Sequence, residues 1–277
     1  MIYELRLFFI ALQFLTRVPV PRWVGFEADW LNQSARHFPA VGLCVGAVAA
    51  ALLWAVHMLL APAVAVGLSM AATLLLTGGF HEDGFADTCD GLGGQVSRER
   101  ALEIMKDSRI GAYGAMGLVL MLGLKAATLA ALPLAWAIPA LLFAHTASRS
   151  AAVWLIRCLP YAGDIAHAKA KPLAQRVSMA GVAVATGWAV GVAAALWAWR
   201  PELAWALTVS AALVVLGTAW CARWLRRRLG GTTGDTLGAA QQITELLALL
   251  GWLAALRWGA GSAAIVGIVG APIGQAG

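Results

Sequence analysis

Charged side chains are scarce in this sequence. Only 12% of the 277 residues are Asp, Glu, Lys or Arg, whereas 61% are hydrophobic. A soluble domain carries about 25% charged residues, so a chain with this composition and a mean hydropathy of +0.76 cannot cover a soluble surface. We therefore expect an integral membrane protein, with the lipid bilayer as a partner.

Cysteine and targeting signals are also sparse. The four cysteines, Cys44, Cys89, Cys158 and Cys221, form no CxxC pair, which excludes the usual zinc and dithiol motifs. No cleavable signal peptide is expected, because the apolar stretch of residues 5–15 is short and no small-residue cleavage site follows it. The net charge of +6 comes from basic residues beside apolar runs, so we expect no nucleic-acid partner.

Long apolar runs dominate what is present. About 20 helical residues cross a hydrocarbon core of roughly 30 Å. The runs predict an all-α, polytopic membrane helix bundle with about seven transmembrane helices in one domain, residues 1–277. The expected spans are residues 38–60, 63–76, 111–132, 134–156, 177–199, 202–220 and 237–256.

Both ends of the chain differ from these spans. Residues 3–15 predict an N-terminal amphipathic helix at the membrane interface, which ends before Pro19 and Pro21. Residues 259–277 are apolar but rich in glycine and contain a proline. Either an eighth short span or a loose tail is compatible with them.

Basic residues gather in alternate loops. One set of loops holds Arg22, Arg36, Arg98, Arg100, Lys106, Arg109, Arg157, Lys169, Lys171, Arg176, Arg223, Arg226, Arg227 and Arg228. The other loops hold only Arg200 and Arg257. The positive-inside rule places the first set in the cytoplasm. Six aspartates fall on that same side: Asp83, Asp87, Asp90, Asp107, Asp164 and Asp235.

An acidic stretch begins a polar segment of about residues 78–110. Charged groups at a membrane edge are rare and usually functional. If the stretch is helical, Asp83, Asp87 and Asp90 stand at i, i+4 and i+7 and share one face. Such carboxylates repel one another unless a cation lies between them, and oxygen ligands favour Mg²⁺ or Mn²⁺ over zinc. The alternative is a solvated acidic cap on a loop.

Two more polar blocks lie on the predicted cytoplasmic face. Lys106, Asp107 and Arg109 precede a glycine-rich helix start, where an arginine suits phosphate. An ordinary membrane anchor is the alternative. Residues 230–235 supply glycines, hydroxyls and an acid before a helix, without the GK[ST] of a Walker motif. A helix cap is the alternative for Asp235.

Four polar side chains interrupt the apolar runs: Lys125, His145, Arg149 and Glu245. Charge is costly in lipid, so each is expected to face protein or water. His145 and Arg149 are i, i+4 neighbours on one helix face. In a transporter such residues would mark an ion path.

The block around residues 79–94 resembles the signature G-x-x-H-x-D-G-x-x-D-x-x-D-G of the cobalamin synthase family, the adenosylcobinamide-GDP ribazoletransferases. Phe85 stands where leucine is usual and keeps the apolar character. The resemblance covers nearly the whole chain. Weaker blocks of the family occur in the expected order along the chain, before and after this signature, at residues 8–19, 37–42, 106–114 and 230–238.

The resemblance implies a Mg²⁺-dependent, multi-pass enzyme of the bacterial inner membrane with its active site facing the cytoplasm. It implies transfer of a cobinamide phosphoryl group from adenosylcobinamide-GDP to α-ribazole or α-ribazole 5′-phosphate. GMP leaves, and adenosylcobalamin or its phosphate forms, late in vitamin B12 biosynthesis. The sequence leaves the oligomeric state open, a homo-oligomer included.

Within this resemblance, Asp83, Asp87 and Asp90 are the expected catalytic residues and Mg²⁺ ligands. One of them, or His81, would take the ribazole hydroxyl proton as general base. Glu82 is expected to support them. The expected substrate-binding residues are Lys106, Asp107, Arg109, Gly231, Gly234 and Asp235.

Three other functions are alternatives. A CDP-alcohol phosphotransferase uses similar acids, but its signature places DG-x-x-AR between them, and no arginine follows Ala86 here. An ion-coupled transporter should have binding groups near mid-span and repeated halves, and no internal repeat is evident. A structural subunit of a B12-assembly complex would leave the acidic cluster unexplained.

Overall fold

The computed structural model describes residues 2–163 and 174–269, and regular structure in these ranges is helical. Asp164, Lys169 and Lys171 lie outside them. The helices are α1 (Ile2–Leu15), η1 (Arg22–Val24), α2 (Ala28–Ser34), η2 (Ala35–His37), α3 (Phe38–His57), α4 (Pro62–Thr77), α5 (Phe80–Gly93), α6 (Arg98–Ile104), α7 (Ala112–Ala131), α8 (Leu134–Cys158), α10 (Met179–Trp199), η3 (Pro201–Leu203), α11 (Ala204–Arg228) and α12 (Gly234–Val269). The predicted all-α class is confirmed.

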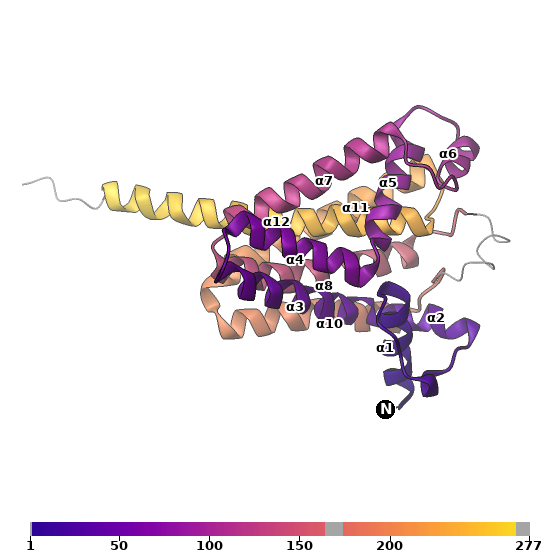
Figure 1. The fold of residues 1–277 in the computed structure, drawn as a ribbon, viewed down its shortest axis with the longest axis horizontal. Coiled ribbons are helices and arrows are strands. Elements are labelled where there is room, and N and C mark those ends of the chain that lie inside the picture. Colours follow the sequence, from indigo (N-terminus) through magenta and orange to yellow (C-terminus); the bar gives the residue numbers. More distant parts are fainter. Residues whose placement is uncertain (1, 164–173, 270–277) are drawn as a thin grey trace, which may run out of the picture.

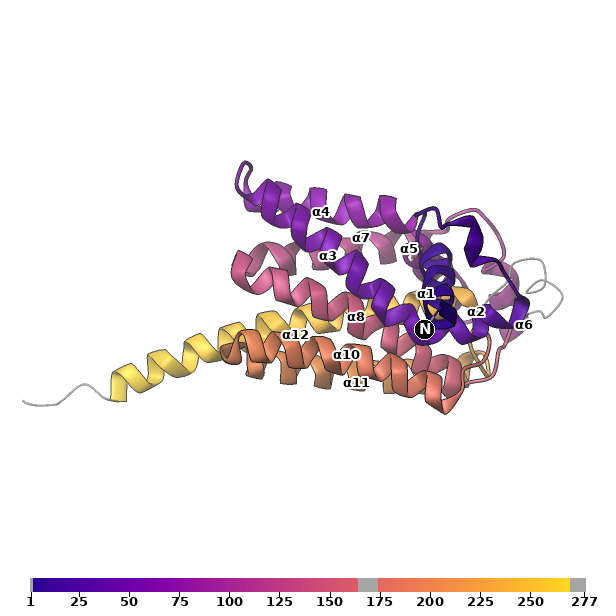
Figure 2. The same ribbon diagram turned by 90° about the horizontal axis from the view of Figure 1, so that it is seen from below.

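The long helices lie side by side in one bundle, with α8 and α12 packed between the others (Figures 1 and 2). Five helices of the described residues are long and apolar enough to cross a membrane, and a sixth crossing results if α4 and α5 are one bent span. α8 has 25 residues but carries buried His145 and Arg149. The predicted membrane bundle is confirmed, whereas the count of seven spans stays a prediction.

The two ends of the chain lie at opposite ends of the bundle. α1 lies across the end that also carries α2, α5 and α6, and it buries Leu7, Ile10 and Ala11 against the bundle (Figure 1). At the other end, α12 continues past the neighbouring helices (Figure 1). Residues 259–269 therefore continue α12 rather than starting a separate span, and residues 270–277 lie outside the described residues.

A sharp break separates α4 from α5 and turns the chain by 89°. Gly78 and Gly79 occupy the break with φ of 71° and 69°, a left-handed conformation that glycine adopts without steric cost. The Gly78 amide donates to the Leu74 carbonyl oxygen, so α4 ends in a left-handed cap. As a result, α5 lies across the end of the bundle instead of along it (Figure 1).

Two contacts hold α5 against its neighbours. On one side, Gly84 packs on the start of α12, where an added Cβ would lie 2.9 Å from both the Cα and the carbonyl oxygen of Asp235. On the other side, the Asp90 carboxylate accepts hydrogen bonds from the backbone amides of Gly111 (2.7 Å) and Gly114 (2.8 Å) at the start of α7. These amides have no partner within their own helix, so Asp90 caps α7.

Glu245 of α12 is the centre of a buried polar cluster inside the bundle. Its Oε1 accepts a hydrogen bond from Lys125 Nζ of α7 at 2.6 Å. Its Oε2 lies 2.9 Å from Nδ1 of His145 and 3.7 Å from the guanidinium of Arg149, both on α8. All four residues are buried. The expectation that these intramembrane groups face protein is confirmed, because they face one another.

Two glutamines of α12 extend the cluster. Gln241 Nε2 donates to Glu245 Oε2 at 2.6 Å. Gln242 Oε1 accepts from Lys125 Nζ at 2.5 Å, and Gln242 Nε2 donates to Glu82 Oε1 of α5 at 2.9 Å. A cavity of about 30 Å³ borders the cluster and has room for water. The interior of the bundle is thus hydrogen-bonded to α5.

We expect Glu245→Gln to destabilise the protein strongly, because Lys125 and Arg149 would remain buried without an opposing carboxylate. Removing one partner of a buried ion pair costs about 3–5 kcal/mol. The midpoint of thermal unfolding of the detergent-solubilised protein measures the effect. Glu202→Gln is the control, because Glu202 pairs with Arg200 at an exposed position and exposed pairs contribute little. Equal midpoints for Glu245→Gln and Glu202→Gln would contradict this account.

We expect Gly84→Ala to lower the same midpoint, because the new methyl group would collide with the backbone of α12. Gly187 of α10 is the matched control, since an added Cβ there meets nothing within 4 Å. In an open helical position, Gly→Ala stabilises a helix by about 1 kcal/mol. Gly187→Ala should therefore keep or raise the midpoint, and a rise in both variants would show that α5 does not pack closely on α12.

Candidate active site

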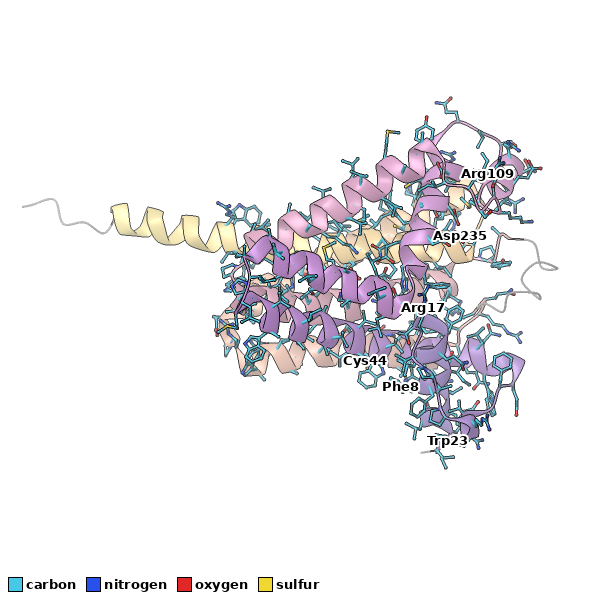
Figure 3. All side chains as sticks on the ribbon, in the orientation of Figure 1. Phe8, Arg17, Trp23, Cys44, Arg109 and Asp235 are labelled. Carbon is cyan, nitrogen blue, oxygen red and sulfur yellow. The ribbon has the colours of Figure 1, made fainter. Side chains whose placement is uncertain are left out.

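An open pocket at the α5 end of the bundle contains two of the three predicted metal ligands. Asp83 and Asp87 line it together with Glu82, Arg17 and Ser108, and its volume is about 530 Å³. We call it the carboxylate pocket. Helix α5, the segment after α1 and the loop before α7 supply these residues, so groups far apart in the sequence meet around one space. Figure 3 shows Arg17 at this end of the molecule, as it does Asp235 and Arg109.

Asp90, the third predicted ligand, has a different environment. Both of its carboxylate oxygens accept hydrogen bonds from α7 amides, and it does not line the carboxylate pocket. In the described parts of the chain, no three His, Cys, Asp or Glu side chains come close enough together to hold a metal ion. The joint ligation of a metal by Asp83, Asp87 and Asp90 therefore stays a prediction.

The donor set of the carboxylate pocket nevertheless suits a hard cation. Asp83, Asp87 and Glu82 present only oxygen atoms, which Mg²⁺ prefers. Glu82 Oε1 is bonded to Gln242, while Glu82 Oε2 is buried without a hydrogen-bond partner. A buried carboxylate oxygen is costly unless a donor or a cation satisfies it. These oxygen-only side chains suit a magnesium ion at Asp83 and Asp87, and its binding there stays a prediction.

His81 faces the interior of the protein. It is buried and lines the small internal cavity beside Glu245, not the carboxylate pocket. Its ring meets that of Phe80 edge-on, with centroids 5.3 Å apart. The arrangement favours an aspartate over His81 as the group that meets a substrate hydroxyl, and the role of His81 in catalysis stays a prediction.

The loop between α6 and α7 carries the predicted phosphate-binding residues. The Arg109 guanidinium forms hydrogen bonds of 2.6–3.2 Å with both carboxylate oxygens of Asp107. These bonds hold the pKa of Asp107 down to about 2, so this carboxylate is ionised at neutral pH. Ser108 of the same loop lines the carboxylate pocket, whereas Arg109 is exposed and already paired with an acid.

Residues 230–235 lie beside α5 and start α12. Thr233 and Thr236 exchange hydrogen bonds between side chains and backbone amides, so these two threonines cap the helix. The alternative that Asp235 is the cap is therefore not needed. Gly231 allows close approach to the Pro160 carbonyl oxygen, and Gly234 is the first residue of α12. The structure brings Asp235 against Gly84 of the signature helix.

Three residues near the site were not among the sequence-based candidates. Arg17 lines the carboxylate pocket, and Gln241 and Gln242 connect the buried cluster. The only sequence signal for the glutamines is their polarity within an apolar run. Arg17 belongs to no charge pattern, and its only sequence signal is its place in the block of residues 8–19 that resembles the family.

Comparison with known proteins agrees with this arrangement. Residues 7–253 match the cobalamin-5-phosphate synthase family. The chain is 61% identical to the adenosylcobinamide-GDP ribazoletransferase of Leptothrix cholodnii over 257 residues, which cover 92% of this chain and 97% of that relative. It is 45% identical to the enzyme of that name from Polaromonas naphthalenivorans, over 91% of this chain and 98% of the relative.

A more distant relative of the same name, from Shewanella frigidimarina, is 43% identical over 89% of this chain and 94% of its own length. No solved structure matches the chain. The matches cover α5 and the loop before α7, which line the carboxylate pocket, and the start of α12, which packs on α5. This chain belongs to the cobalamin-5-phosphate synthase family.

Proposed function

We propose that this protein is an adenosylcobinamide-GDP ribazoletransferase that acts at the carboxylate pocket. The observation that carries the proposal is the 61% identity to a relative of that name over 92% of the chain. The pocket adds a physical reason, because a diphosphate substrate needs oxygen-bound cations and basic groups close together. A CDP-alcohol phosphotransferase or a transporter would not explain this family membership.

The proposed reaction joins two substrates. A hydroxyl oxygen of α-ribazole, or of its 5′-phosphate, forms a bond to the phosphorus of the cobinamide phosphoryl group. The bond between that phosphorus and the oxygen bridging to GMP breaks, and GMP leaves with the electron pair. The hydroxyl proton passes to a carboxylate of the pocket. Adenosylcobalamin, or its phosphate, is the product.

We assign Asp83 and Asp87 as the residues that hold Mg²⁺, since both line the carboxylate pocket. Mg²⁺ bound there would neutralise the diphosphate and stabilise the leaving oxygen of GMP. One of the two aspartates is the general base, because a proton acceptor must reach the attacking hydroxyl. Asp90 orients the start of α7, next to the loop that carries Lys106, and so shapes the pocket from one side.

We assign the remaining predicted residues to substrate binding. Lys106, Asp107 and Arg109 lie in the loop that contributes Ser108 to the pocket, and Arg109 is oriented by Asp107. Gly231, Gly234 and Asp235 do not line the carboxylate pocket; Asp235 packs against Gly84 of α5, so we assign this segment to binding a part of the substrates outside the pocket.

The location of the site follows from loop charge. The pocket lies at the bundle end that carries most of the basic loops, and the positive-inside rule assigns that end to the cytoplasm. We therefore propose a bacterial inner-membrane enzyme that meets its substrates from the cytoplasmic side.

Asp87→Asn tests the metal assignment. We expect turnover to fall by at least about 100-fold, because even groups that merely orient metal ligands contribute 10–100-fold. Membranes containing the variant are supplied with adenosylcobinamide-GDP, α-ribazole and Mg²⁺, and GMP release is measured with and without EDTA. Glu99→Gln, on exposed α6, is the control and should retain activity. Substantial EDTA-sensitive GMP release by Asp87→Asn would reject the role of Asp87 as a metal ligand.

A further inference from the structure

Arg17 is held over the break between α4 and α5. Its backbone amide donates to the Leu76 carbonyl oxygen at 2.8 Å, which ties the residue after α1 to the last turn of α4. Its guanidinium lies directly against Gly78, and a Cβ on Gly78 would collide with Arg17 Nε. The left-handed glycine therefore serves two purposes: it permits the turn, and it leaves space for the arginine.

The guanidinium of Arg17 is not used by the protein itself. It lines the carboxylate pocket with Asp83, Asp87 and Glu82. Within residues 2–163 and 174–269, however, it has neither a hydrogen bond nor an ion pair. A guanidinium presents five N–H donors in a rigid fork that matches phosphate, so the exposed Arg17 can offer these donors to a phosphate that enters the pocket.

Four other arginines at this end of the bundle have protein partners. Arg109 bonds to Asp107, and Arg36 bonds to Glu4. Arg98 donates to the carbonyl oxygens of Leu229 and Ala162, and Arg228 donates to that of Gly94. These side chains fasten loops and helices to one another. Arg17 differs from these four because it lines the pocket and its guanidinium has no partner among the described residues.

We propose that Arg17 is a substrate-binding residue that contacts the diphosphate of adenosylcobinamide-GDP. This inference rests on the proposed function and deepens it. The acids of the pocket hold a cation, and the diphosphate also requires donors that the acids cannot supply. A bidentate contact with phosphate oxygens satisfies the Arg17 fork and places the phosphoryl group beside Asp83 and Asp87.

The test compares Arg17→Gln, Arg17→Lys and the control Arg22→Gln in vesicles of phosphatidylcholine. Arg22 is exposed in the same N-terminal region and lines none of the pockets described above. GMP release is followed while each substrate is varied in turn. We expect Arg17→Gln to raise KM for adenosylcobinamide-GDP by about 10- to 100-fold, as for loss of a charge-assisted hydrogen bond. The KM for α-ribazole should stay unchanged.

Arg17→Lys should recover part of the affinity, because it keeps the charge but not the bidentate geometry. Arg22→Gln should behave as the wild type. A second readout is titration calorimetry of adenosylcobinamide-GDP without α-ribazole, so that no turnover occurs. Arg17→Met, which keeps an apolar stem of similar length, replaces Arg17→Gln if the latter is not recovered folded.

Several outcomes would overturn the inference. One is an unchanged affinity of Arg17→Gln or Arg17→Met for adenosylcobinamide-GDP. Another is an equal rise in KM for both substrates, which would indicate general damage. A third is an effect that appears only when the vesicles contain phosphatidylglycerol, since Arg17 would then bind a lipid phosphate. A wild-type protein that releases no GMP would instead reject the proposed function.

Discussion

The buried carboxylate of Glu245 is the interaction on which the rest of this bundle depends. Helices inside a bilayer gain no hydrophobic energy by meeting one another, and a charge among them needs a partner. Lys125 and the pair His145 and Arg149 supply partners from two other helices. Rotation of α7, α8 or α12 about its own axis would leave a buried charge unpaired, so the cluster determines which faces of these helices meet.

The same cluster is hydrogen-bonded to α5, at the end of the bundle that carries the candidate active site. Gln242 bonds both to Lys125 inside the bundle and to Glu82 on α5. Together with the Asp90 contact to α7 and the packing of Gly84 on α12, this bond holds α5 across the bundle end. A short helix that turns 89° away from its predecessor would otherwise have few restraints. Its acidic side chains are thereby held at one edge of the membrane domain.

Electrostatic balance explains the composition of the carboxylate pocket. Glu82, Asp83 and Asp87 bring negative charge together with Arg17, whose guanidinium has no hydrogen-bond or ion-pair partner among the described residues. A cation held by the acids and a phosphate bound to the arginine would balance the charges that this pocket brings together. Family membership and the pocket thus agree on one kind of chemistry, the transfer of a phosphoryl group.

Hydropathy and the spacing of acids are local properties, and by themselves they determined the all-α membrane class and the acidic helix, while the resemblance of residues 79–94 to a known signature indicated the family. They also indicated that Lys125, His145, Arg149 and Glu245 face protein or water, and the structure shows that they face one another. Helical periodicity predicts which face of a helix a residue occupies, but it does not predict which other segment packs against that face. Asp90 shares the spacing of Asp83 and Asp87, yet it meets an amide 21 residues later. Gln242 reaches Glu82 across 160 residues, and Arg17 reaches the pocket only because α4 breaks at two glycines. These contacts join distant segments, so only the tertiary structure decided them.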